Sequence, residues 1–185
     1  KPGGDRNNDY YDFAFVELSD SQCDNLGATS FITESMISHN RSDKERRGYM
    51  ALGFPEQMQL TNYDVRRIFT EAWTYVGFHR PNQALNESLG ISGEQHFAIR
   101  FDQRVKTFKG AERDAPNPKG TSGGILIDLG NFDPEKMRPN TPCTGLLSGI
   151  LIEHRCEHGI ILATDIRFIV EQMRRAGKMG SDSAT

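Results

Sequence analysis

The sequence has little cysteine: only Cys23, Cys143 and Cys156 in 185 residues. They are too few and too unevenly spaced for a disulfide framework, which excludes the class of small secreted disulfide scaffolds. Low cysteine content favours a reducing, intracellular setting, and we expect a cytoplasmic protein. No apolar run approaches the roughly 18 residues that a membrane-spanning helix needs, and no signal-peptide pattern opens the chain. We therefore expect no membrane partner.

The sequence also lacks an excess of basic charge. Its 22 Lys and Arg residues against 25 Asp and Glu residues give a formal net charge of −3. A nucleic-acid surface needs clustered Lys and Arg, so we expect no nucleic-acid partner. The short basic group "KERR" at 44–47 is interpreted as solvated loop charge. The remaining composition, 36% hydrophobic and 25% charged, is that of an ordinary globular protein.

What the sequence does contain is a series of short apolar or alternating segments typical of strands. These segments lie at 10–20, 48–57, 67–78, 94–102, 123–130, 146–155 and 159–166. The polar stretches 79–93 and 107–120 are expected to be connections, and the aromatic residues Trp73, Tyr75 and Phe78 are expected in the core. Strands thus dominate the chain up to its last segment.

The last segment changes period and predicts an amphipathic helix. Its apolar stripe follows i, i+3, i+4, i+7 and consists of Ile166, Ile169, Val170 and Met173. Thr164 or Asp165 can cap the start of this helix, and Gly177 is placed to end it. The predicted fold class is all-β, a barrel or sandwich, with a C-terminal α-helix.

One stretch, "PKGTSGGILIDLG" at 118–130, places Ser122 among three glycines just before a strand. A serine nucleophile needs a base to take its proton and donors to hold the oxyanion that forms on the substrate. Flanking glycines let successive N–H groups point into one space, and those of Gly120 and Ser122 are the natural pair. The alternative is a glycine hairpin with a solvent-facing serine, and the motif alone leaves both open.

The segments around this motif resemble the trypsin/chymotrypsin-like serine peptidases, in their disulfide-poor, bacterial or intracellular-type branch. That family carries G-x-S-G-G at its nucleophile, then a strand, a variable loop, a strand of the form apolar-x-G-I-apolar, and a last strand leading into a terminal helix. The counterparts here are "GTSGGILIDL", "LLSGILIEHR" and "GIILATDIRFIVEQM". The strand "DFAFVEL" matches the family's aspartate-bearing strand, and "YMALGFP" resembles the opening of its second barrel. The resemblance covers nearly the whole chain, with a longer loop at 130–145.

The resemblance implies roles for individual residues. Ser122 would be the nucleophile, Asp12 the buried acceptor that orients a histidine, and the N–H groups of Gly120 and Ser122 the oxyanion hole. The strand from Ile152 through Glu153 to His154 would bind substrate backbone by strand addition, beside the loop around Pro116. Glu153 would then favour a basic substrate side chain. Thr121 stands where the digestive branch carries an aspartate, so activation through a new N-terminus is not expected.

The third triad member, a histidine that precedes the aspartate in this family, has no counterpart before Asp12. The five histidines are His39, His79, His96, His154 and His158, and all of them follow Asp12 in the sequence. We therefore expect the base to come from an upstream first-barrel segment of the same protein. The expected organisation is a lead-in (1–11), the last strand region of the first barrel (12–30), an inter-barrel connection (31–47), the second barrel (48–165), the helix (165–177) and a tail (178–185).

The sequence "HRCEH" alternates three zinc-capable side chains, those of His154, Cys156 and His158. No fourth ligand is evident and "CEHG" is typical of a turn, so a hairpin tip is the preferred interpretation and no metal or other cofactor is expected. The predicted function is a serine endopeptidase acting on peptide or protein substrates. The alternatives are an inactive trypsin-like barrel that serves as a protein-binding or scaffold module, and an unrelated barrel with a coincidental glycine turn.

Overall fold

The computed structural model describes residues 13–26, 31–39, 47–62, 67–80, 83–106, 110–131, 143 and 145–177, and in these ranges β-structure predominates. The strands are β1 (Arg47–Gly53), β2 (Gln59–Asn62), β3 (Arg67–Thr70), β4 (Trp73–Phe78), β5 (His96–Arg100), β6 (Arg104–Lys106), β7 (Glu112–Asp114), β8 (Ile125–Asn131), β9 (Leu146–Arg155) and β10 (Ile160–Asp165). The helices are α1 (Asp20–Asn25), α2 (Gln83–Leu89) and α3 (Ile166–Arg175), with 3₁₀ turns η2 (Glu34–Met36), η4 (Glu56–Met58) and η5 (Cys156–His158). A mostly-β fold with a C-terminal helix is thus confirmed.

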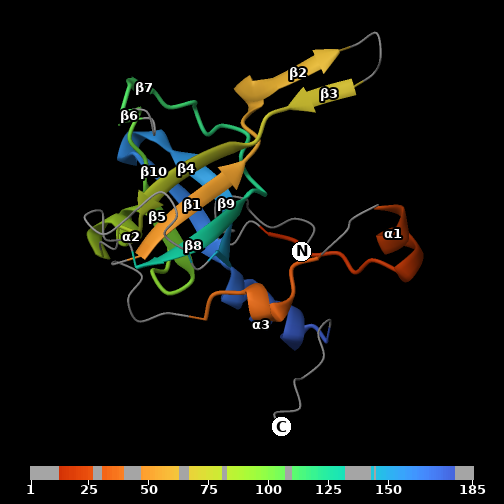
Figure 1. Ribbon diagram of the computed structural model, residues 1–185. Coiled ribbons are helices and arrows are strands. Elements are labelled where there is room, and N and C mark those ends of the chain that lie inside the picture. Colours follow the sequence, from red (N-terminus) through yellow and green to blue (C-terminus); the bar gives the residue numbers. More distant parts are fainter. Residues whose placement is uncertain are drawn as a thin grey trace.

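Six strands form one antiparallel sheet in the order β4-β1-β8-β9-β10-β5, while β2–β3 and β6–β7 are separate two-stranded ribbons (Figure 1). The β2–β3 ribbon projects away from the main sheet (Figure 1). At one end the two edge strands meet: His79 forms a bridge to Ile99, and the Arg80 N–H donates to the Ala98 carbonyl at 2.8 Å. The sheet is therefore strongly curled and barrel-like.

The inner face of this sheet holds the main core. Its buried members are Tyr49, Ala51, Trp73, Tyr75, Phe97, Ile99, Phe101, Leu126, Leu151, Ile161 and Ala163. Burial alternates strictly along β4, so Trp73 and Tyr75 lie inside as expected. The expectation that Phe78 lies in the core was wrong. Burial alternates from one residue of β4 to the next, so the Phe78 side chain points outward and is 41% exposed.

The C-terminal helix forms as predicted. The Asp165 carboxylate caps α3 by accepting the Arg167 N–H at 3.0 Å, and Gly177 follows the helix with a φ of 68°. Ile166, Ile169 and Val170 bury their side chains against Ile37 and Leu147. None of the helices in the described ranges has the length and apolar character needed to cross a membrane.

Three segments differ from the expectation. Residues 13–19 form no strand, and Val16 is 80% exposed, because no described strand lies alongside them to pair their backbone groups. Phe13 instead packs edge-on against Phe168 of α3. The connection 79–93 contains α2, whose Leu85 and Leu89 are spaced four apart on one face and pack on the sheet. Part of the predicted loop 107–120 pairs as β7 with β6.

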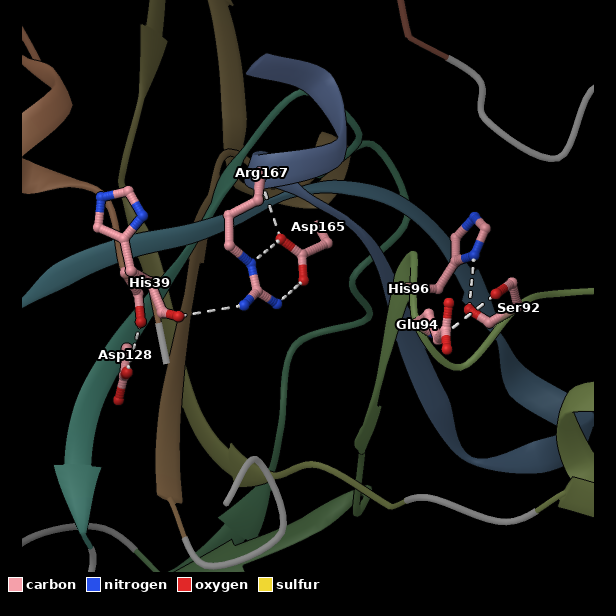
Figure 2. A network of polar contacts seen from close by, with 8 residues as sticks. His39, Ser92, Glu94, His96, Asp128, Asp165 and Arg167 are labelled. Carbon is pink, nitrogen blue, oxygen red and sulfur yellow. Dashed lines mark hydrogen bonds and ion pairs between the residues drawn. The ribbon is translucent and has the colours of Figure 1, made fainter. Parts of the chain in front are cut away.

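Buried polar contacts fasten the segment 31–39 to the sheet and to α3. The Asp128 carboxylate on β8 accepts hydrogen bonds from the Arg47 Nε and the Ser38 hydroxyl, each at 2.9 Å. Figure 2 shows the Arg167 guanidinium facing the Asp165 carboxylate and reaching the His39 carbonyl oxygen. The interpretation of Arg47 as a solvated charge was therefore wrong, because its side chain is 10% exposed and paired.

Candidate functional site

The turn that carries Ser122 is shaped by glycines. Gly120 and Gly123 have φ values of 89° and 86°, a region that side chains other than glycine rarely enter. The Thr121 N–H and hydroxyl both donate to the Pro118 carbonyl, at 3.0 and 2.8 Å, and the Gly124 N–H donates to the Thr121 carbonyl at 2.8 Å. These bonds fix the backbone on both sides of the serine.

This turn is held between two strands of the main sheet. On one side the Glu56 N–H, just after β1, donates to the Lys119 carbonyl at 2.9 Å. On the other side Gly123 and Gly124 exchange hydrogen bonds of 2.8 Å with Leu151 of β9. A Cβ on Gly124 would lie 2.4 Å from the Leu52 carbonyl oxygen, so only glycine fits there. The glycine turn is thus a packed part of the fold rather than an isolated hairpin tip.

A cleft of about 340 Å³ opens beside this turn. It is lined by Asn117, Pro118, Lys119, Gly120, Thr121, Ser122, Ile152, Glu153, His154 and Cys156. The structure therefore brings Ser122 and Gly120 together with the three residues expected on the substrate-binding strand. Pro116 does not line this cleft, and Asp12 lies outside the described residues. Sequence reasoning missed Asn117 and Lys119, although both belong to the loop that it singled out.

Two residues that line the cleft have a backbone N–H without an acceptor in the described part of the chain. Among the described residues, neither the Gly120 N–H nor the Ser122 N–H has an intramolecular hydrogen-bond acceptor. They stand on either side of Thr121, whose N–H donates to Pro118, and backbone N–H groups without an acceptor attract negative charge. Two donors of this kind are what an oxyanion hole requires.

The Ser122 hydroxyl lies at the edge of the cleft, where it donates to the Ile152 carbonyl at 2.7 Å. The five histidines are all described, and only His154 lines the cleft. His79 accepts the Ala98 N–H at its Nδ1, and the Nδ1 of His96 lies 3.1 Å from the Ser92 carbonyl (Figure 2). No histidine of the described chain is hydrogen-bonded to Ser122.

The His154 ring is half-buried in the cleft wall. It packs edge-on against Phe101, with ring centroids 5.0 Å apart. Burial lowers the pKa of His154 from its usual value of 6.5, and the charge of Glu157 opposes this shift. The imidazole is therefore predominantly neutral at pH 7.

We expect an NMR titration to show a midpoint for His154 below 6.5, because burial disfavours the protonated ring. Since the unfolded chain then binds more protons, the contribution of His154 to folding stability is lost as the pH falls from 6.5 through the lower pKa. Truncating its ring partner with Phe101→Ala should raise the midpoint, which two-dimensional imidazole spectra of both proteins would measure. A midpoint at or above 6.5 in the unsubstituted protein would contradict this account.

The charged groups of the cleft already have counter-ions. The Lys119 ammonium lies 2.9 Å from the Glu56 carboxylate, whose hydrogen bond raises the pKa of Lys119. The Glu153 carboxylate lies 2.8 Å from the Arg155 Nε, close enough for an ion pair although the alignment is not that of a hydrogen bond. A basic substrate side chain would thus compete with Arg155 for Glu153.

The "CEHG" segment forms the 3₁₀ turn η5, closed by Gly159 in the left-handed region. Within the described ranges, no three His, Cys, Asp or Glu side chains gather in a way that could hold a metal ion.

Comparison of the chain with protein-family models, with curated proteins and with solved structures finds no match.

Proposed function

We propose that this chain carries the nucleophile and the oxyanion hole of a serine endopeptidase with the trypsin-like fold. The observation that carries the proposal is that Ser122 lines a cleft together with Gly120, and that the N–H groups of both residues have no acceptor among the described residues. A curled six-stranded antiparallel sheet followed by a helix is compatible with the second barrel of that fold. The fixed glycine turn also favours the proposal, since preorganised donors need no rearrangement during the reaction.

In the proposed reaction the Ser122 Oγ attacks the carbonyl carbon of a peptide. A carbon–oxygen bond forms, and the hydroxyl proton passes to a histidine base supplied by another segment of the same protein. The oxyanion accepts hydrogen bonds from the Gly120 and Ser122 N–H groups, the amine leaves with the proton, and water hydrolyses the acyl-enzyme. The substrate backbone would lie along β9 at 152–154, where the cleft borders that strand.

This function can be tested with a fluorophosphonate probe, which reacts only with activated serines. We expect the complete natural protein to gain the mass of one adduct, mapped to Ser122 by peptide sequencing, because oxyanion donors and a base activate that hydroxyl. The Ser122→Ala variant should gain none. An adduct confined to other residues, or equal labelling of the variant, would contradict the proposal.

A second candidate function, an inactive barrel that binds a protein partner, is favoured by one specific contact. The Ser122 hydroxyl is bonded to the Ile152 carbonyl rather than to a histidine of the described chain. If the protein is such a binding module, the fluorophosphonate probe should form no adduct on Ser122, while peptides should still bind to the cleft. An upstream strand that ends in a histidine would favour the peptidase instead.

A further inference from the structure

We propose that His154 makes the Ser122 cleft selective for a peptide side chain that is uncharged and hydrogen-bonding, of the glutamine type. The inference rests on the proposed function only in requiring that a peptide binds beside Ser122. It does not require that the peptide is cleaved.

The first support is the availability of the His154 ring. Its nitrogens form no hydrogen bond with any described residue, yet the ring lines the cleft together with Ser122. The ring is also held in place, because it packs on Phe101, which in turn packs on Tyr75 with ring centroids 5.0 Å apart. An unpaired imidazole on a fixed aromatic base is thus presented to whatever enters the cleft.

The second support is the charge state of that ring. Burial lowers the pKa of His154, so at pH 7 the ring offers one N–H donor and one acceptor nitrogen. A primary carboxamide offers the complementary pair, a carbonyl acceptor and an NH₂ donor. A carboxylate offers acceptors only, and an ammonium offers donors only. The neutral imidazole therefore matches an amide more fully than it matches either charged group.

The third support is that the lining charges are already neutralised. Glu153 is paired with Arg155, and Lys119 is paired with Glu56. A charged side chain entering the cleft would lose part of its own hydration, and no unpaired charge among the described lining residues compensates for that loss. The side chain of Asn117, which also lines the cleft, adds a further uncharged polar group. The cleft is thus polar without an unpaired charge.

The test measures peptide binding to the Ser122→Ala chain, which cannot turn the peptide over and in which the Ile152 carbonyl is free. Four fluorescent hexapeptides differ at a single position, which is Gln, Glu, Lys or Leu, and fluorescence anisotropy gives their Kd values at pH 7. We expect the Gln peptide to bind about tenfold more tightly than the others, the effect of one additional hydrogen-bonded pair. Adding His154→Ala should reduce this advantage, measured as the ratio of the Leu-peptide Kd to the Gln-peptide Kd in the same protein, to less than about threefold.

Two further variants make the result specific. His154→Phe keeps a ring against Phe101 but removes the hydrogen-bonding nitrogens, so it should lose the Gln advantage even if His154→Ala fails to fold. His158→Ala removes an exposed histidine of the adjacent turn and should leave all four Kd values unchanged. Thermal unfolding followed by circular dichroism verifies that each variant is folded.

The inference is overturned if the Lys or Glu peptide binds most tightly, if His154→Phe keeps the Gln advantage, or if no peptide binds. These outcomes are separable from failure of the proposed function. Gln selectivity without fluorophosphonate labelling would sustain the inference and reject the peptidase. Labelling of Ser122 by the fluorophosphonate, without a preference for the Gln peptide that depends on His154, would reject the inference and sustain the peptidase.

Discussion

Replacing Asp128 with alanine should lower the free energy of unfolding by about 3–5 kcal/mol, because it removes a buried carboxylate that pairs with a buried guanidinium and accepts three hydrogen bonds. Asp128 is 1% exposed and accepts hydrogen bonds from the Arg47 Nε, the Ser38 hydroxyl and the Gly130 N–H. All three donors lose their acceptor at once in the variant. Domains of ordinary stability have about 5–15 kcal/mol in total, so the loss is a large fraction of the whole.

Urea unfolding measures this effect, as a lower midpoint with an unchanged slope. The matched control is Asp102→Ala, which removes an exposed carboxylate that lies 3.0 Å from the Arg100 Nε. That pair is solvated, so its loss should cost less than about 1 kcal/mol. Equal effects of the two substitutions would show that burial does not govern the Asp128 contacts. The double substitution Arg47→Met, Asp128→Leu should recover part of the loss, because it replaces both buried charges of the pair with apolar side chains.

The hydrogen bonds that the Asp128 carboxylate accepts also bear on the candidate site. Asp128 lies on β8, the strand that begins directly after the Ser122 turn, and Arg47 lies on β1, which pairs with β8. Ser38 joins the segment before β1 to the same carboxylate. Because these contacts fix β1 against β8, they also set the position of the turn that lies between β1 and β9.

Strands and the last helix could be predicted because their patterns are local. The apolar runs that became β8, β9 and β10, and the stripe of α3, each show their period within one segment. The strand expected before α1 shows the same apolar pattern but does not form, since a strand also needs a partner that no local pattern reveals. Phe78 illustrates a further limit, because aromatic character alone does not say which face of a strand is buried.

The candidate site could be predicted in part for the same reason. The glycine spacing around Ser122 is a local signal, and the resemblance added the strand at 152–154, which lines the same cleft. The pairing of Arg47 with Asp128 could not be foreseen, because the two residues are 81 positions apart in the sequence. Charged side chains of both kinds are also far more often exposed to solvent than buried. The neutralisation of Glu153 by Arg155 likewise depends on side-chain positions. Charge states in a cleft therefore need the structure.

For the proposed peptidase, replacing Ser122 with alanine should reduce peptide hydrolysis about 10⁴–10⁶-fold in kcat, the range seen when a nucleophile of this kind is removed. The KM should not rise, because the Ser122 hydroxyl occupies the Ile152 carbonyl in the free chain and competes there with a substrate N–H. Initial rates over a range of concentrations of a fluorogenic peptide would separate the two parameters.

The chain offers a close control in Ser88, an exposed serine whose hydroxyl also donates to a backbone carbonyl, that of Leu85, at 2.8 Å. Both substitutions remove one hydroxyl and one such hydrogen bond, but only Ser122 lines the same cleft as Gly120, whose N–H has no acceptor among the described residues. Ser88→Ala should therefore leave both parameters unchanged. Comparable losses in the two variants would mean that the local hydrogen bond, and not nucleophilic attack, accounts for the effect. Undiminished hydrolysis by Ser122→Ala would assign the activity to another residue, and the glycine turn would then be a structural element.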